Sequence, residues 1–247
     1  MTRRRYETAP PALAFDLEPG HVLDDRYVVV GPLGAGWEGE VYRVRERRTR
    51  IERAAKLFYP QRNRGDRVAS TYARKLHKLR RCEVLIRYHG RCEVEVGDQE
   101  VTCLISECVE GELLSGFLAR QPGQKLSPFQ AVHLLYALVC GMEAIHHQGE
   151  YHGDLHKENV ILQGVGLTFE LKLLDLYTQP GSSAENRRED IVDLVRIFYE
   201  ALGGRRTYSR QPQEVKEIVR GMRRKLILER FRNIWDLRYH LEELRWE

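Results

Sequence analysis

The stretch YHGDLHKEN, Tyr151–Asn159, places a carboxylate, two imidazoles, a lysine and an amide within nine residues. It follows a segment that begins at Ser127 and Pro128, carries apolar residues at helical spacing and ends near Gly149. Proline is common in the first position of a helix, so we expect a long helix directly before the stretch. Two apolar runs of strand type, NVILQ and LKLLD, come after it on either side of a glycine turn. The sequence therefore predicts a polar loop between a helix and a pair of strands.

The chain divides into a strand-rich first half and a helical second half. Strand-type runs begin near Arg26 and continue to Glu107, with turn signals such as Gly97-Asp98 between them. Apolar residues at helical spacing over residues 68–79 predict one helix in this half. Beyond Gly111 the helical spacing dominates. We assign residues 1–22 to an irregular lead-in, 23–108 to the strand-rich part and 109–247 to the helical part.

Composition limits the class of protein. With 247 residues and 42% hydrophobic content, the chain can bury a substantial core. A net charge of +4 is common among soluble proteins, and we expect no nucleic-acid partner. We expect no segment to be long and apolar enough to span a bilayer, and hence a cytoplasmic protein without a membrane partner. Five cysteines without CxxC spacing predict reduced thiols rather than a disulfide framework or a zinc site; they are Cys82, Cys92, Cys103, Cys108 and Cys140.

The segment GAGWEGEV, residues 34–41, fits the pattern G-x-G-x-x-G-x-V between two predicted strands. Glycines of this kind let the backbone approach phosphate oxygens and present amide hydrogens to them. A dinucleotide-binding fold would place a helix directly after the glycines, whereas the strand-type run GEVYRVRE follows here. The pattern indicates a phosphate-binding hairpin, with an ordinary glycine hairpin as the alternative.

Lys56 lies in the strand-type run AAKLF. Apolar neighbours are a poor setting for an ammonium group unless an anion meets it, and a phosphate would serve. The alternative is a lysine at a strand edge that extends to water. Because Lys56 follows shortly after the glycine pattern, we favour the interpretation that it binds a phosphate.

Over residues 26–245 the chain resembles the protein kinase superfamily. The resemblance lies in the order of its features: the glycine pattern, the strand lysine, one helix, further strands, HGDLHKEN, and Asp175 in LKLLDLY. The resemblance is to a divergent eukaryotic-like serine/threonine protein kinase of bacterial type. It implies an α+β, bilobal protein kinase-like fold, with a small antiparallel β-sheet lobe carrying one helix, a larger α-helical lobe and a shortened activation segment. It also implies an ATP- and Mg²⁺-dependent phosphotransferase that transfers the γ-phosphate to serine or threonine of a protein substrate.

The resemblance assigns roles to particular residues. Asp154 would orient the attacking hydroxyl and accept its proton, and Asn159 and Asp175 would bind magnesium. His156 or Lys157 could touch the γ-phosphate. Asp190 would contact the backbone of the catalytic loop, or merely cap its helix. The positions implied in nucleotide binding are Gly34, Gly36, Gly39 and Lys56 on the phosphates, Val41, Ala54 and Ile161 around the base, and Glu107 and Val109 as hinge backbone next to Ser106.

Departures from the family pattern leave two alternatives open. No acidic residue occurs from Arg67 to Arg81, where the family supplies a glutamate partner for the strand lysine, and Ala73 is near that position. A nucleotide-binding pseudokinase that serves as an interaction module is therefore one alternative. Gly153 replaces the arginine that commonly contacts a phosphorylated activation loop. The short segment 176–189 and the HGDLH sequence are similar to aminoglycoside and choline phosphotransferases, so a small-molecule kinase is the other.

Overall fold

The computed structural model describes residues 14–166, 168–178 and 181–245. The chain forms two compact units. Of the described residues, the sheet unit contains 14–80 and 86–109, and the helical unit contains 81–85 and those from 110 to 245. Most of the expected lead-in, residues 1–13, lies outside the described residues.

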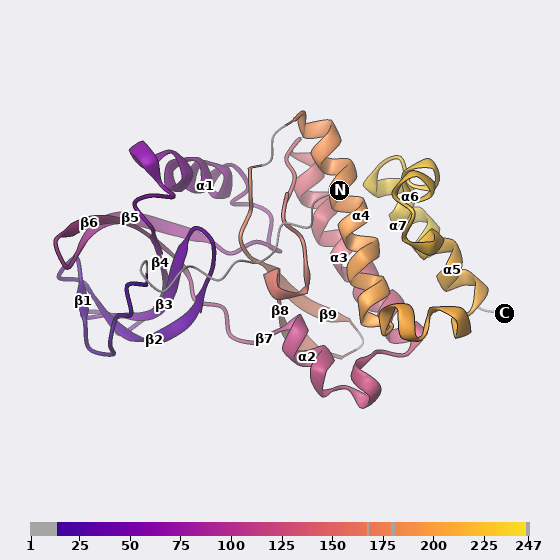
Figure 1. The fold of residues 1–247 in the computed structure, drawn as a ribbon, viewed down its shortest axis with the longest axis horizontal. Helices are drawn as coiled ribbons and strands as arrows, with labels where there is room; N and C mark the ends of the chain where they lie inside the picture. The colour runs from indigo at the N-terminus through magenta and orange to yellow at the C-terminus, as the bar shows by residue number, and fades with distance from the viewer. Residues whose placement is uncertain (1–13, 167, 179–180, 246–247) are drawn as a thin grey trace. The chain divides into compact units, whose positions relative to one another are not determined.

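The sheet unit contains an antiparallel six-stranded sheet in the order β1-β2-β3-β4-β6-β5 (Figure 1). Among its described residues α1, Arg67–Lys78, is the one α-helix, and it lies against β5 and β6. The sequence predicts that regular structure begins near Arg26. It begins earlier, at Val22, because β1 pairs with β2. The strands are β1 Val22–Leu23, β2 Tyr27–Ala35, β3 Gly39–Glu46, β4 Glu52–Phe58, β5 Tyr88–Val96 and β6 Gln99–Glu107.

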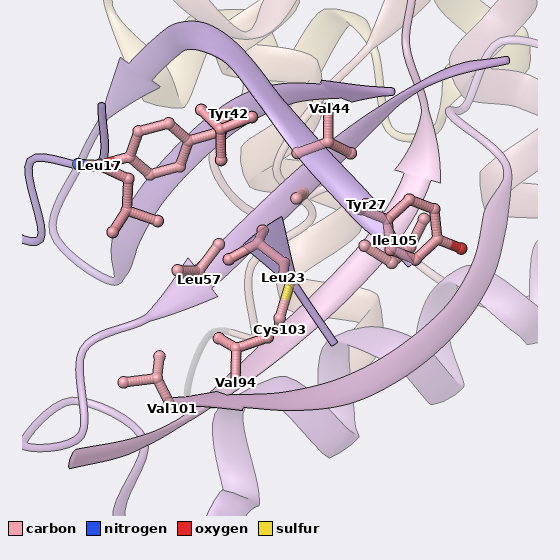
Figure 2. Packing of buried hydrophobic residues seen from close by; sticks show 12 residues of the cluster. Leu17, Leu23, Tyr27, Tyr42, Val44, Leu57, Val94, Val101, Cys103 and Ile105 are labelled. Atoms are coloured by element: carbon pink, nitrogen blue, oxygen red, sulfur yellow. The ribbon is translucent and has the colours of Figure 1, made fainter. Parts of the chain in front are cut away.

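One face of this sheet carries a compact apolar cluster, seen in Figure 2. Residues alternate along each strand between this face and the opposite one, as the period of two requires. A fully buried leucine or valine contributes about 1.5–3 kcal/mol to the stability of the fold. The cluster consists of Leu17, Leu23, Tyr27, Val29, Tyr42, Val44, Ala55, Leu57, Val94, Val101, Cys103 and Ile105.

A buried carboxylate joins the residues before β1 to the sheet. Glu40 on β3 accepts a hydrogen bond from the backbone N–H of Phe15 at 2.8 Å and others from the hydroxyls of Tyr42 and Tyr59. Burial, reinforced by donation to this carboxylate, raises the pKa of both tyrosines above their usual range. Because a buried charge needs such partners, Glu40 fixes the path of the chain around Phe15.

The helical unit combines a three-stranded antiparallel sheet, β7-β8-β9, with helices of which α3 packs against α4 and α7 (Figure 1). Together with the sheet unit this is the α+β, bilobal kinase-like fold that the sequence predicts. Its elements are β7 Glu112–Leu113, α2 Leu114–Arg120, α3 Pro128–His147, β8 Val160–Val165, β9 Phe169–Leu173, α4 Ser183–Ala201, α5 Gln213–Val219, α6 Arg224–Arg230 and α7 Ile234–Glu242.

Helix α3 begins where the sequence predicts. The Ser127 side chain accepts a hydrogen bond from the backbone N–H of Gln130, and the Gln130 side chain accepts one from the backbone N–H of Ser127. Pro128 occupies the first turn. By length and composition this helix could cross a membrane, so our expectation that no segment could is wrong. Leu134, Leu135 and Leu138 are nevertheless fully buried within the unit, as in the central helix of a globular core.

The helix α5 is shorter than the spacing of its apolar residues predicts. Spacing places Val215, Ile218, Val219 and Met222 on one helical face, but α5 ends at Val219. Arg220 takes a left-handed backbone conformation with φ of 50°, which no α-helix can include. Met222 therefore lies outside the buried stripe.

A substitution at Gly39 tests how β3 and β4 approach each other. A Cβ atom there would lie 1.9 Å from the carbonyl oxygen of Leu57, so the strands would have to separate. We expect Gly39→Ala to lower the free energy of unfolding by about 1–3 kcal/mol, measured by urea unfolding. Gly31→Ala is the matched control, since its Cβ would meet no atom within 4 Å. Equal stability of the two variants would contradict this close approach.

Candidate active site

The glycine pattern forms a hairpin turn in the sheet unit. Gly34 pairs with Val41 across β2 and β3, and the backbone N–H of Gly36 donates to the carbonyl of Gly39 at 2.9 Å. A strand follows the turn, as expected, and Gly34 and Gly36 are exposed. At the tip, the guanidinium of Arg62 lies 3.2 Å from the centre of the Trp37 ring. The turn therefore presents exposed backbone, as a phosphate site requires, next to an aromatic side chain that is held in place.

Lys56 forms an ion pair with an acidic residue of this turn. Its Nζ lies 3.0 Å from Oε2 of Glu38, and both side chains are largely buried, with 12% and 19% of their surface exposed. The helix α1 contributes an aromatic face instead of a carboxylate, because the ring centre of Tyr72 lies 4.8 Å from Nζ. Sequence reasoning missed Glu38. The signal was available, since Glu38 is the acid between Gly36 and Gly39.

The other expected nucleotide-binding residues of the sheet unit lie on adjacent strands. Val41 on β3 pairs with Lys56 on β4, and Ala54 on β4 pairs with Ser106 on β6. Glu107 ends β6, and its backbone N–H donates to the carbonyl of Arg87 at 2.8 Å. The structure therefore brings Val41 and Lys56 together on neighbouring strands. Val109 follows β6 in the same unit, and Ile161 lies on β8 of the helical unit, opposite Lys172.

In the helical unit a buried carboxylate fixes the catalytic loop. Asp190 on α4 has no exposed surface, and its oxygens accept hydrogen bonds from the backbone N–H groups of His152 at 2.9 Å and Gly153 at 3.0 Å. The Nε2 of His146, on α3, lies 2.9 Å from the same carboxylate. Bonds to a charged acceptor are stronger than neutral ones, so α3 and α4 hold the loop jointly. The contact implied by the family resemblance is confirmed.

Asp154 and Asn159 are joined across this loop. The side-chain nitrogen of Asn159 donates to the carbonyl oxygen of Asp154 at 2.9 Å, and the backbone N–H of Asp154 donates to Nδ1 of His152 at 3.3 Å. These bonds fix the backbone while 47% of the Asp154 side-chain surface stays exposed. Because the side-chain nitrogen of Asn159 makes this bond, the amide group is oriented and its oxygen points away from the Asp154 carbonyl. The loop therefore offers a carboxylate and an amide oxygen with a set orientation.

Asp175 is held beside the same loop. The strand β9 ends before it, at Leu173, and two backbone hydrogen bonds of 2.9 Å flank it: Leu174 N–H donates to Asn159, and Tyr177 N–H donates to His152. Its φ of 52° is left-handed, a conformation that aspartate tolerates better than most residues. The structure thus brings Asp154, Asn159 and Asp175 together, as the sequence resemblance requires.

The donor set fits magnesium bound with phosphate. Within residues 14–166, 168–178 and 181–245, no group of three His, Cys, Asp or Glu side chains is placed to hold a metal ion by itself. Magnesium bound with a nucleotide needs one or two protein oxygens and takes the rest of its shell from phosphate and water. Asp175 and Asn159 supply that number.

His156 and Lys157 differ in their surroundings. The Nε2 of His156 lies 3.6 Å from Asp154, and its Nδ1 lies 3.0 Å from Glu158. Burial by itself lowers the pKa of His156, but the carboxylates of Asp154 and Glu158 outweigh it and raise the pKa above its ordinary value. Lys157 lies 3.6 Å from Glu200 on α4. His156 is therefore the residue of the pair that stands next to the candidate base.

Comparison with known proteins agrees with this geometry. Residues 27–226 match the protein kinase domain. The chain belongs to the protein kinase domain family. Over 157 residues it is 32% identical to the serine/threonine-protein kinase pkn2 of Myxococcus xanthus, covering 62% of this chain and 18% of that protein. It is 31% identical to the serine/threonine-protein kinase PkaA of Streptomyces coelicolor, covering 58% of this chain and 28% of the relative. The kinase domain thus spans less than a third of the length of either relative.

Solved structures share the fold of this kinase domain. A double mutant of the PknI kinase domain of Mycobacterium tuberculosis superposes with a TM-score of 0.67 at 18% identity, covering 92% of this chain and 98% of that one. A single mutant of the same domain gives 0.66 at 20% identity, with the same two coverages. At such identities the likeness shows the fold alone.

The glycine in the catalytic loop of this kinase domain has a structural reason. Gly153 has a φ of +87°, and a Cβ atom there would lie 2.6 Å from the carbonyl oxygen of Tyr177. A side chain would therefore push residue 177, and Asp175 with it, away from the loop. The departure from the family arginine is tied to the close approach of these two segments.

Removing the charge of Asp190 should weaken the kinase domain. Asn at this position keeps one acceptor oxygen but turns an amide group toward a backbone donor. We expect Asp190→Asn to lower the free energy of unfolding by about 3 kcal/mol, measured by urea unfolding followed by far-ultraviolet circular dichroism. The control Glu189→Gln removes a neighbouring carboxylate whose partner Arg224 is exposed, and should change stability by less than about 1 kcal/mol. Similar effects of both changes would contradict the anchoring role.

Proposed function

We propose that this kinase domain is an ATP- and magnesium-dependent protein serine/threonine kinase. The observation that supports it most strongly is the cluster of Asp154, Asn159 and Asp175, held in place by backbone bonds and by Asp190. The relatives in Myxococcus and Streptomyces, which are named serine/threonine-protein kinases, support the same acceptor.

In this reaction the helical unit activates the acceptor. Asp154 orients a serine or threonine hydroxyl and accepts its proton, while the hydroxyl oxygen bonds to the γ-phosphorus and the bond to the oxygen of ADP breaks. His156, whose pKa is raised by the carboxylates of Asp154 and Glu158, carries positive charge more readily at neutral pH and lies 3.6 Å from Asp154. Asn159 and Asp175 would hold magnesium, which neutralises charge on the phosphates.

The sheet unit supplies the phosphate-binding groups. The turn that contains Gly34, Gly36 and Gly39 lets the backbone approach the phosphates, and the ammonium of Lys56 binds them. Val41, Ala54 and Ile161 contact the base, and Glu107 and Val109 bind its edge. We extend the proposal to a cytoplasmic location, since the odd number and spacing of the cysteines favour a reducing compartment.

The catalytic role is tested at Asp154. Because the side chain is half exposed, Asp154→Asn should leave the fold intact while lowering phosphate transfer from γ-labelled ATP by about 10²–10⁴-fold. The matched control Glu158→Gln, which removes a carboxylate from the same loop, should retain most of the activity. Undiminished turnover in Asp154→Asn would overturn the assignment.

The same assay identifies the acceptor. Purified protein with magnesium and labelled ATP is incubated alone, with a generic protein acceptor, and with aminoglycoside, choline and sugar alcohols. Label in protein serine or threonine supports the proposal. Label in the small alcohols would show the small-molecule kinase instead, and nucleotide binding without transfer would show a pseudokinase. The variant Lys56→Met, which lacks the ammonium group, is the negative control for phosphate transfer.

The contact between Glu38 and Lys56 gives a second prediction. The carboxylate lies where the ammonium would meet phosphate, so it competes with the nucleotide. We expect Glu38→Gln to lower the KM for ATP about five-fold, which corresponds to about 1 kcal/mol of repulsion between hydrated charges at about 4 Å. Glu93→Gln, which removes an acid elsewhere in the sheet unit, should leave KM unchanged. A higher KM in Glu38→Gln would instead show that Glu38 positions Lys56 for the nucleotide.

A further inference from the structure

Two cysteines stand directly opposite each other in the sheet unit. Cys92 on β5 pairs with Cys103 on β6 in an antiparallel register. Residues opposed in this way have Cα atoms about 4.5 or 5.5 Å apart, depending on the hydrogen-bond pattern. Disulfides form when the Cα atoms are about 4.4–6.8 Å apart. The backbone therefore already holds the pair at a separation that a disulfide accepts, with both residues present as thiols.

The two thiols differ in access. Cys103 has no exposed surface and lies in the apolar cluster with Leu23 and Val94, as Figure 2 shows. Cys92 is partly buried on β5, which is one of the two edge strands of the sheet. It lines a surface cavity of about 210 Å³ together with Arg26 and Arg53. A small reagent from solution can therefore reach Cys92, while Cys103 is shielded behind it.

The hydrogen bond between the two cysteines favours a thiolate at Cys92. A hydrogen bond from the Cys103 thiol lowers the pKa of Cys92, against the opposing effects of burial and of Asp24 and Glu93, and Arg26 helps to lower it. The same bond, together with burial, raises the pKa of Cys103. Since the thiolate is the reactive form of cysteine, Cys92, the more accessible member of the pair, is also the more reactive one.

We propose that Cys92 and Cys103 form a redox modification site, at which a hydroperoxide oxidises Cys92 and Cys103 then closes a cross-strand disulfide. In the first step the Cys92 sulfur attacks the peroxide oxygen. The O–O bond breaks, the sulfur becomes a sulfenic acid, and the leaving oxygen takes a proton as water or an alcohol. In the second step the Cys103 sulfur attacks the sulfenic sulfur. The S–S bond forms, and hydroxide leaves with the Cys103 proton as water. A small dithiol reverses the reaction by thiol–disulfide exchange.

Cys82 and Cys140 lack this arrangement and serve as internal controls. Cys82 and Cys140 belong to the helical unit, and burial raises the pKa of each. Neither lies opposite Cys92 or Cys103 in the register of the sheet. Both should therefore react more slowly with peroxide.

Peptide mapping tests the proposal without any kinase assay, so its outcome is independent of the proposed function. The reduced full chain is treated with hydrogen peroxide, alkylated under denaturing conditions and digested. Trypsin releases residues 92–120 as one peptide that contains Cys92, Cys103 and Cys108. A second digestion after glutamate separates residues 92–93, 101–107 and 108–110. We expect peptide 92–93 to be linked to peptide 101–107, with a mass lower than the sum of the two by two hydrogens. Dithiothreitol should remove the link.

Variants assign the order of the steps. In Cys103→Ala the sulfenic acid cannot be resolved, so Cys92 should be labelled by dimedone, a carbon nucleophile specific for sulfenic acids. In Cys92→Ser the buried Cys103 should stay reduced, and Cys140→Ser should keep the full yield of linked peptide. Alkylation of both thiols in the treated wild type while Cys82 or Cys140 is oxidised would overturn the proposal. A link from Cys92 to Cys108 or to a second chain would also overturn it.

Discussion

The buried charge of Asp190 is the constraint on which the helical unit depends. A carboxylate without exposed surface is tolerated only when hydrogen bonds replace its water, and here the donors are two backbone N–H groups of the catalytic loop and a histidine of α3. The same bonds that stabilise the charge also fix the conformation of residues 152–153. The position of Asp154 therefore follows from the hydrogen bonds that the preceding residues, His152 and Gly153, donate to Asp190 on α4.

From this anchor the rest of the site is connected through the main chain. Asn159 closes the loop on the carbonyl of Asp154, and the backbone on either side of Asp175 bonds to the loop at Asn159 and His152. The close approach of residue 177 leaves room only for hydrogen at the α carbon of Gly153. The three candidate catalytic groups thus need few contacts between side chains, because backbone bonds set their spacing.

In the sheet unit the ammonium group of Lys56 lies among apolar strands and needs a counter-charge. With no acid on α1, the chain provides the counter-charge from the glycine turn, through Glu38, and an aromatic face from Tyr72. The ion pair between Glu38 in the turn and Lys56 on β4 couples the lysine to the conformation of the turn. This arrangement distinguishes the domain from one in which the helix carries the partner.

The sequence by itself determined the order of strands and helices, the glycine turn between β2 and β3, and the identity of Asp154, Asn159 and Asp175 as candidate site residues. These features are local: a glycine pattern, a helix start at Ser127-Pro128 and the spacing of HGDLHKEN depend on residues near each other in the chain. Helix ends were less well predicted, as the left-handed turn at Arg220 shows, because a single backbone angle decides them.

Only the tertiary structure decided the pairings across long separations. The contacts of Glu38 with Lys56 and of Asp190 with His146, and the opposition of Cys92 and Cys103, each depend on strand register or helix packing. A shift of one residue in register would turn either cysteine to the other face of the sheet. Because register follows from the burial of a whole face rather than from neighbouring residues, the sequence supplied these side chains but could not pair them.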